Sequence, residues 1–349
     1  MDVIRRGGRG EAVRDVQHRL LAAGLRVSGD ELDGTFGAST EEAVREFQRR
    51  RGLPSDGLVG ADTWSQLVES GYRLGDRTLY LRSPAFRGDD VRELQRMLNA
   101  LGFDAGKQDG IFGPRVTHAL MEFQGNSGAK VDGIVGLDTV RSLEGMRPTL
   151  EGPSRAVVRE EEAARTMVAS LAGSVVAVEA GADEGGDRIA AQIADALVVE
   201  LEHRGARPLL LSADADADAD VSARAKRANA NEAIVCVSVG VGSGEPVAAG
   251  AACFFYGTPQ THSPMGKRLA ECILAALARN AGLKDGGTHA RSIAILRETR
   301  MPAVRVEPAV ATNADEAEAV TQPGFAARVA VAIADGVDAF FGPAVPGGD

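Results

Sequence analysis

The sequence predicts a multidomain protein in which two small all-α modules of three helices each precede a three-layer α/β domain. Two observations predict this. A block within the first 145 residues occurs twice, and from Gly173 onward short apolar runs alternate with amphipathic stretches. A length of 349 residues suits more than one domain. A hydrophobic content of 44% and a charged content of 25% are ordinary globular values, which exclude a collagen, a coiled coil and a wholly disordered chain.

The repeat is defined by residue types that recur at a fixed spacing. Val13 and Gln17 recur 78 positions later as Val91 and Gln95, and a two-residue deletion then reduces the spacing to 76. Beyond the deletion, the matching segments are 33–37 with 109–113, 47–48 with 123–124, and 56–60 with 132–136. So many matches with one small gap establish a true duplication, which we divide into module 1 (1–72) and module 2 (73–145).

Each copy is expected to form a helix, an Asp-Gly loop, a second helix, a second Asp-Gly loop and a short third helix. Val13, Val16 and Leu20 follow the three-to-four spacing of an amphipathic helix, and Val44 with Phe47 supplies the apolar face of the next one. The loop glycines suit turns that need a positive φ.

A linker is expected at 146–172, because this stretch contains Pro148, Pro153 and a charged run before a short helix. The α/β domain then occupies 173–342, and 343–349 form a tail. Within the domain, we predict strands at 175–178, 208–211, 233–239, 251–256, 292–296 and 303–306, and helices at 187–203, 221–231, 267–281 and 322–340.

Charge, apolar runs and cysteines limit the classes of function. A net charge of −10 argues against sequence-independent binding of nucleic acid. No apolar run approaches the roughly 18 to 20 residues of a membrane span, and the first ten residues have no apolar signal core, so we expect a cytoplasmic protein without a membrane span. Cys236, Cys253 and Cys272 have no close partner in sequence, and we interpret them as reduced core thiols.

The repeated segments resemble the peptidoglycan-binding type 1 domain, whose pattern runs G-x-x-V-x-x-L-Q, D-G-x-F-G, F-Q and D-G-x-x-G. The resemblance implies that peptidoglycan fragments or precursors are the ligands. The candidate ligand-binding residues are Asp33, Phe36, Phe47, Gln48, Asp109, Phe112, Phe123 and Gln124. The alternative, which we favour residue by residue, is that these are turn and core positions, because the phenylalanines and loop glycines are needed for folding alone.

The α/β half resembles the zinc-dependent N-acetylmuramoyl-L-alanine amidase family, type 3. Arg224 with Ala228 and Asn229 matches its R-x-x-x-A-N helix, and residues 301–307 match its P-A-V-L-V-E strand. The resemblance implies hydrolysis of the amide between muramic acid and the stem peptide. In such enzymes two His and one Glu hold Zn²⁺, which activates a water molecule, and a further Glu acts as general base.

The chain departs from the family pattern at the metal ligands. The D-P-G-H-G-G motif reads as residues 179–184 here, which puts Ala182 at the first His, and an ungapped count from Asn229 puts Gly240 at the His of S-I-H-A-N. The Glu ligand falls near 186–188, where Asp187 is the one carboxylate. Glu307 matches the general base; we interpret it as a relic, a hydrogen-bonded structural carboxylate or a ligand contact, and we favour the first two over the third. We therefore predict no metal site and no cofactor; zinc applies only if the enzyme is active.

Other candidate ligand groups have simpler interpretations. His203, His262 and His289 fall at a helix end or in loops, and no two of them have the spacing of a helical zinc site. The alternating carboxylates of 214–220 lack the glycine and bidentate Glu of a calcium loop, and we interpret them as a solvated loop.

Three functions remain in competition. The first is a non-catalytic pseudoamidase that binds peptidoglycan, a precursor or a cell-wall precursor enzyme and regulates wall synthesis; it resembles actinobacterial cytoplasmic amidase-like regulators. The second is an active N-acetylmuramoyl-L-alanine amidase, for which Glu307 is the chemical support. The third is an adhesive protein of the wall or spore layer.

Overall fold

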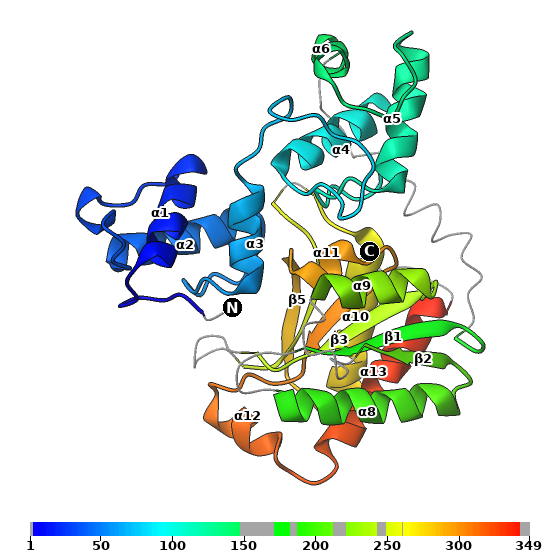
Figure 1. Ribbon diagram of the computed structural model, residues 1–349. Coiled ribbons are helices and arrows are strands. Elements are labelled where there is room, and N and C mark those ends of the chain that lie inside the picture. The colour runs from blue at the N-terminus through cyan, green and yellow to red at the C-terminus, as the bar shows by residue number, and fades with distance from the viewer. Residues whose placement is uncertain are drawn as a thin grey trace, which may run out of the picture. The chain divides into compact units, whose positions relative to one another are not determined.

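A computed structural model describes residues 3–146, 171–181, 187–211, 221–242, 249–259 and 261–342. The chain divides into two compact units, Met1–Glu162 and Ala163–Asp349, which are drawn in Figure 1. The predicted linker lies almost wholly outside the described residues, as does the predicted tail at 343–349. The boundaries placed in those stretches stay predictions.

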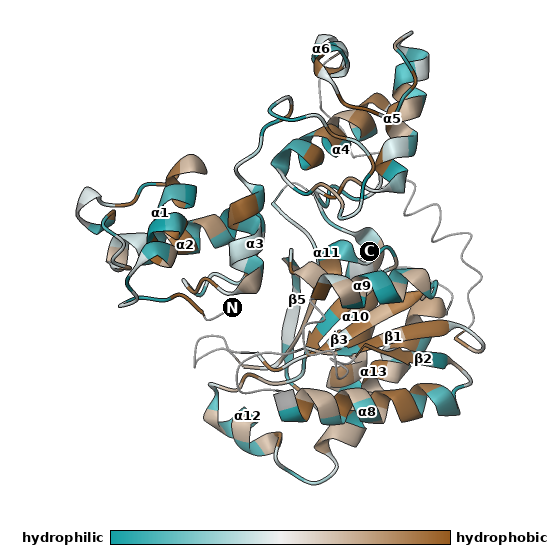
Figure 2. Cartoon of the chain, in the orientation of Figure 1, coloured by the Kyte–Doolittle hydropathy of each residue, from teal (hydrophilic) through white to brown (hydrophobic). Residues whose placement is uncertain are grey.

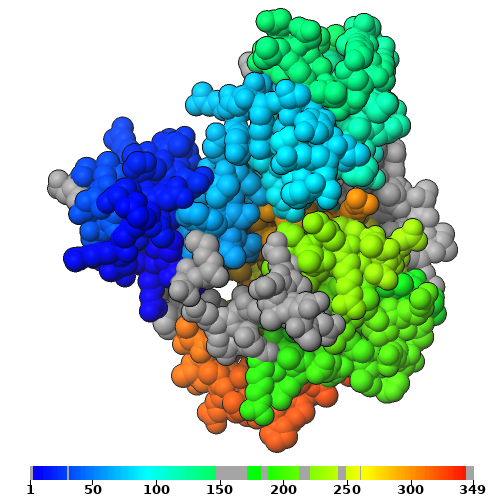
Figure 3. Space-filling view, in the orientation of Figure 1, coloured from blue at the N-terminus to red at the C-terminus, as the bar shows by residue number. Residues whose placement is uncertain are grey.

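The first unit contains the two predicted modules, and the three-helix pattern of each is confirmed. Module 1 has α1 (Glu11–Ala22), α2 (Ala38–Arg51) and α3 (Ala61–Glu69), with the short 3₁₀ turn η1 (Gly29–Glu31) before α2. Module 2 has α4 (Asp89–Leu101), α5 (Pro114–Asn126) and α6 (Leu137–Gly145). Each module has its own apolar core; Figure 3 shows the outer surface of module 1 in blue and of module 2 in cyan to green.

Equivalent loop contacts fix the path of the chain in both modules. An isolated bridge pairs Arg9 with Thr35 in module 1, and the matching bridge pairs Arg87 with Ile111 in module 2. The loop glycines beside these bridges have positive φ values, 92° at Gly34 and 78° at Gly110. A Cβ on Gly34 would lie 2.9 Å from the Gly10 oxygen, so both the turn and the close approach require glycine there.

A carboxylate caps the start of α2. Glu31 accepts hydrogen bonds from the Ser39 N–H at 3.0 Å and from the Thr40 N–H and hydroxyl, both at 2.8 Å. Burial opposes ionisation of Glu31, but the bonds from the Ser39 and Thr40 backbone and side chains outweigh it and lower its pKa to about 2. The carboxylate therefore satisfies donors that the first turn of a helix leaves without intrahelical partners.

An ion pair joins the two modules. The guanidinium of Arg51, the last residue of α2, donates two hydrogen bonds to the carboxylate of Asp89 at the start of α4, at 2.5 and 2.6 Å. Both side chains are about one-third exposed or less. Two parallel bonds fix the relative orientation of the two planar groups as well as their distance.

The second unit is built on a six-stranded sheet of order β2-β1-β3-β6-β4-β5. The strands are β1 (Val175–Ala180), β2 (Arg207–Leu210), β3 (Val235–Val239), β4 (Ala251–Tyr256), β5 (Asp285–Arg291) and β6 (Ala303–Glu307). The pair β4 and β6 is antiparallel, and the other neighbours are parallel. The helices are α8 (Asp187–His203), α9 (Val221–Ala230), α10 (Pro264–Asn280), α11 (Ala294–Glu298), α12 (Ala314–Ala319) and α13 (Phe325–Phe341).

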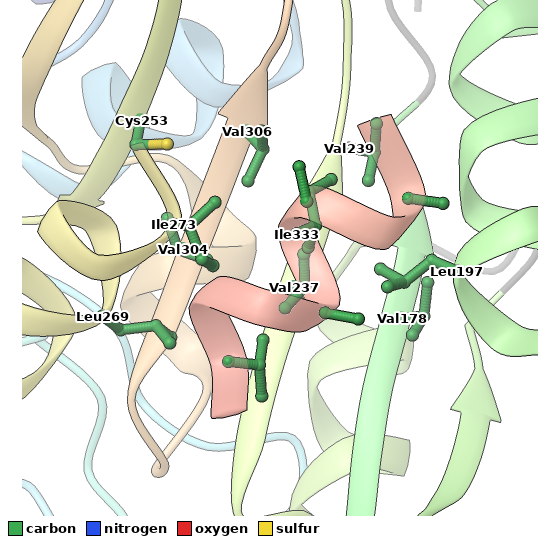
Figure 4. Close-up of a cluster of buried hydrophobic side chains, with 14 of the residues drawn as sticks. Val178, Leu197, Val237, Val239, Cys253, Leu269, Ile273, Val304, Val306 and Ile333 are labelled. Atoms are coloured by element: carbon green, nitrogen blue, oxygen red, sulfur yellow. The ribbon is translucent and has the colours of Figure 1, made fainter. Parts of the chain in front are cut away.

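Helices cover both faces of this sheet, which confirms the three-layer prediction. On one face α8, α10 and α13 bury apolar side chains against the central strands; Figure 4 shows Leu197, Leu269 and Ile333 around Val237 and Val304. On the other face α9 and α11 pack against alternate strand residues, which form a smaller cluster. The central strands are strongly hydrophobic in Figure 2, as expected for strands buried on both sides.

One predicted strand is wrong. Residues 292–296 contain α11 instead, and the edge strand β5 lies earlier, at Asp285–Arg291. A short apolar run such as the one around Ile295 fits a buried helical turn as well as a strand. The true strand pairs with β4 alone, and its residues are polar or small and only partly buried or exposed, so it has no apolar signature. Helix α12 was also not predicted.

The cysteines agree with the interpretation as core thiols at two of the three positions. Cys236 and Cys253 are free and buried, and Cys272 is half-buried. Burial raises the pKa of the Cys253 thiol, so it stays protonated at neutral pH. Within the described ranges, each helix is too short or too polar to cross a membrane.

Candidate active site at the ends of the central strands

One register row of the sheet is polar. Glu179 of β1 pairs with Ser238 of β3, which pairs with Arg305 of β6, so all three side chains lie on the α9 and α11 face. This row lies near the carboxyl ends of the parallel strands, where open α/β sheets commonly bind ligands. It is therefore the candidate site, and most of its residues were not predicted.

The first part of the row is a buried ion pair. The Nε of Arg224, on α9, lies 2.8 Å from Oε1 of Glu179, whose side chain is 2% exposed. A carboxylate so deeply buried is stable only with a cation beside it. Five residues further along α9, Asn229 Nδ2 donates a hydrogen bond to the backbone oxygen of Glu298, and its Oδ1 accepts one from the Arg300 N–H. The matched R-x-x-x-A-N positions thus hold α9 to the sheet and to the segment after α11.

Glu307, the predicted counterpart of the general base, lies two residues beyond Arg305 on β6 and therefore on the same face of the sheet as the row. Its Oε1 accepts a hydrogen bond from Arg305 Nε at 3.1 Å and another from Arg291 Nη1 at 3.3 Å. Both Arg305 and Glu307 are at least nine-tenths buried as residues. The guanidinium of Arg291 lies over the Phe254 ring, 3.5 Å from its centroid. Glu307 is thus the shared anion of two arginines.

The guanidinium of Arg305 fills the space beside two glycines. A Cβ on Gly240, just after β3, would lie 1.9 Å from Arg305 Nη2. A Cβ on Gly181, just after β1, would lie 2.2 Å from Nη1. Neither position has room for a side chain while Arg305 is in place, because real Cβ contacts essentially never fall below 3.0 Å.

The described residues do not fit the zinc site that the family implies. Gly240 offers no ligating side chain, and a cation fills the adjacent space, where it would repel Zn²⁺. In the described part of the chain, no three His, Cys, Asp or Glu side chains lie together as a metal would need. Ala182 and the side chain of Asp187 lie outside the described residues, as does the acidic run 214–220.

The three histidines of the second unit lie on different elements. His203 ends α8 and is exposed, and His262 is exposed with its ring 6.1 Å from that of Phe255. His289 was expected in a loop but lies on the edge strand β5, where its Nε2 is 2.9 Å from the Gly286 backbone oxygen. These positions agree with their interpretation as surface polar residues.

The phenylalanines proposed as ligand contacts lie inside the modules. They are at most 2% exposed and belong to the two module cores: Phe36, Phe47, Phe112 and Phe123. Such burial leaves almost no surface for a ligand and agrees with the interpretation of these residues as core positions. Their binding of a ligand stays a prediction.

The paired glutamines hold the second Asp-Gly loop of each module. Gln48 Nε2 donates to Asp56 Oδ1 at 2.7 Å and to the Leu58 oxygen at 2.9 Å, while its Oε1 accepts from the Gly57 N–H at 2.9 Å. Gln124 makes the same set of bonds to the matching loop of module 2. Both glutamines are 1% exposed. Ligand binding by these glutamines also stays a prediction.

The two aspartates of the first loops have local roles as well. Asp33 Oδ1 accepts from the Thr35 N–H at 2.9 Å. Asp109 Oδ1 accepts from the Ile111 N–H at 2.9 Å and from Gln95 Nε2 at 2.7 Å. Sequence reasoning did not identify Gln95 as a loop anchor, although its recurrence in the repeat was a usable signal.

The protein thus consists of a duplicated three-helix module followed by a three-layer α/β domain with a polar row at its strand ends. The chain belongs to the N-acetylmuramoyl-L-alanine amidase family, whose model matches residues 177–339. The putative peptidoglycan binding domain matches twice, at 9–67 and 87–143.

The relatives span different shares of the chain. The N-acetylmuramoyl-L-alanine amidase CwlM of Mycobacterium tuberculosis is 35% identical over 337 residues, which cover 89% of this chain and 83% of the relative. The amidase CwlL of Bacillus licheniformis is 32% identical over 162 residues, 41% of this chain and 45% of the relative. The solved catalytic domain of CwlV from Bacillus (Paenibacillus) polymyxa is 26% identical, with a TM-score of 0.43, over 48% of this chain and 97% of that domain.

Proposed function

We propose that this chain is a non-catalytic amidase-like protein that binds peptidoglycan fragments or precursors and thereby regulates cell-wall synthesis in the cytoplasm. The observation that carries the proposal is the position of Arg305. Its guanidinium lies against Gly240, where the family pattern has a His ligand, and it pairs with Glu307, where the family has its general base. A cation of the chain itself thus fills the space beside the position that would carry a zinc-ligating His.

The retained fold favours binding as the remaining role. The modules keep their loop anchors and cores, and the α/β domain keeps a fully packed sheet. Two modules on one chain raise the effective concentration of the second for a repetitive ligand once the first is bound. The buried free thiols Cys236 and Cys253 support a reducing compartment. A cytosolic wall precursor, or an enzyme that makes one, is the partner that this location favours.

The decisive experiment uses the purified full chain. After dialysis we expect no stoichiometric zinc by elemental analysis, no cleavage of muropeptide amide with zinc supplied, and binding of muropeptide by calorimetry. One zinc per chain together with amide cleavage would instead establish the second candidate, an active N-acetylmuramoyl-L-alanine amidase. Glu307, at the position of the general base, is the observation that favours this candidate.

A second experiment tests the partner. The full chain and a truncated form with residues 151–349 are used as baits in cytosolic extract. We expect recovery of a wall-precursor enzyme or precursor by the full chain and its loss with the truncated form, because the modules contribute to binding. Equal recovery by both forms, or accumulation of the native protein outside the membrane, would contradict the proposal.

A further inference from the structure

Two departures from the family pattern meet at one point in space. The pattern P-A-V-L-V-E has Leu where this chain has Arg305, and S-I-H-A-N has His where this chain has Gly240. The positions are 65 residues apart in sequence, on β6 and directly after β3, which are neighbouring parallel strands. One side chain has become larger and charged while the other has been reduced to a hydrogen atom.

The guanidinium is surrounded by Glu307, Ser238 and two glycines. Nε donates to Glu307 at 3.1 Å. Nη1 lies 3.5 Å from the Ser238 hydroxyl and against Gly181, and Nη2 lies against Gly240. Because a Cβ on either glycine would fall within 2.2 Å of a guanidinium nitrogen, the planar group fits only between two residues that have no side chain.

We propose that Arg305 and Gly240 act as one replacement for the metal centre: Arg305 provides a permanent cation for Glu307, and Gly240 provides the room that this cation needs. The inference rests on the proposed function, in which the site holds no zinc. It explains why Glu307 is retained without a metal, since a carboxylate nine-tenths buried needs a positive neighbour. It also implies that an imidazole at position 240 and the Arg305 side chain exclude each other.

A double-mutant cycle in the full chain tests this coupling. The variants are Gly240→Ala, Arg305→Leu and their combination, followed by calorimetry and by hydrogen exchange of the β3 and β6 amides. In the presence of Arg305, Gly240→Ala is expected to lower the Tm of the second unit by roughly 2 to 12 °C through overpacking. In the Arg305→Leu background the same change is expected to shift the Tm by less than about 2 °C, because the added methyl group then has space.

Gly336→Ala is the matched control. This glycine lies on α13, on the other side of the sheet, and its Cβ would lie 2.4 Å from the Cα of Ile273. Gly336→Ala should lower the Tm by the same amount with and without Arg305. If Gly240→Ala does not fold alone, Gly181→Ala replaces it, since its Cβ meets Nη1 of the same guanidinium.

The outcomes separate this inference from the proposed function. Equal losses from Gly240→Ala in both backgrounds would overturn the pairing of Gly240 with Arg305, even for a protein that is free of zinc. Stoichiometric zinc and amide cleavage by the unaltered chain would overturn the proposed function itself. We expect Gly240→Ala to lower the Tm when Arg305 is present and to leave it nearly unchanged in the Arg305→Leu background. We also expect a chelator to leave the Tm of the unaltered chain unchanged.

Discussion

Replacing Gln48 with leucine tests whether this glutamine builds module 1 or binds its ligand. The side chain is buried and makes three short hydrogen bonds to the loop formed by Asp56, Gly57 and Leu58. At about 1 kcal/mol for each buried bond, Gln48→Leu should cost about 3 kcal/mol. For a domain of this size the change corresponds to a fall in Tm of roughly 12 °C or more.

The assay uses the single tryptophan of the chain. Trp64 lies on α3 and packs against the core of module 1, so its fluorescence follows the unfolding of that module. Gln66, on the same helix, is 2% exposed, and its Nε2 has no hydrogen-bond partner among the described residues. Gln66→Leu therefore removes no amide donor bond and should leave the transition within about 0.5 kcal/mol of wild type or stabilise the module.

Two results would refute this reasoning. Equal destabilisation by both leucine variants would mean that the loss of a buried polar group, rather than of the loop hydrogen bonds, sets the cost. Unfolding of Gln48→Leu within about 1 kcal/mol of wild type, combined with lost muropeptide binding, would make Gln48 a ligand contact rather than a loop anchor.

Three further predictions concern charged groups. Glu31→Ala should cost module 1 about 1 to 3 kcal/mol at pH 7, the lower value from the loss of a helix cap and the upper value from the lowered pKa. Because the folded pKa of Glu31 is about 2 and its reference value is 4.5, this difference should be present above pH 4.5 and disappear toward pH 2 in urea unfolding; a constant difference would contradict the prediction. Arg224→Leu should cost the second unit about 3 to 5 kcal/mol in calorimetry, since Glu179 stays buried without its partner; a loss below about 1 kcal/mol would contradict it. Arg51→Ala should widen the distribution of distances between spin labels on the two modules, because the paired bonds to Asp89 are lost; an unchanged distribution would contradict it.

The sequence predicts the helices of the modules and the buried strands well, because apolar periodicity and glycine turns carry that information locally. It fails at β5, where a polar edge strand is stabilised by β4 through backbone bonds that composition does not show. The ungapped count places Gly240, but nothing in the pattern indicates that Arg305 lies against it. That contact depends on the register between β3 and β6, a long-range property of the sheet.

The same limit applies to the modules. The interpretation of Phe47 as a core residue follows from its apolar character and helical spacing, and its 2% exposure agrees with it. The role of Gln48 does not follow in this way, because an amide at that position could bind a ligand or a loop. Its hydrogen bonds to Asp56 and Leu58 are defined only by the fold.

The ion pair between Arg51 and Asp89 has a consequence for ligands made of repeating units. Two binding modules joined by a flexible linker can bind sites at a wide range of spacings, but conformational entropy is lost when the second module binds. The two parallel hydrogen bonds between Arg51 and Asp89 restrict the range of spacings between the modules before a ligand binds. If both modules bind one polymer, we expect the Arg51–Asp89 pair to favour a polymer whose repeat matches the spacing of the modules that this pair maintains.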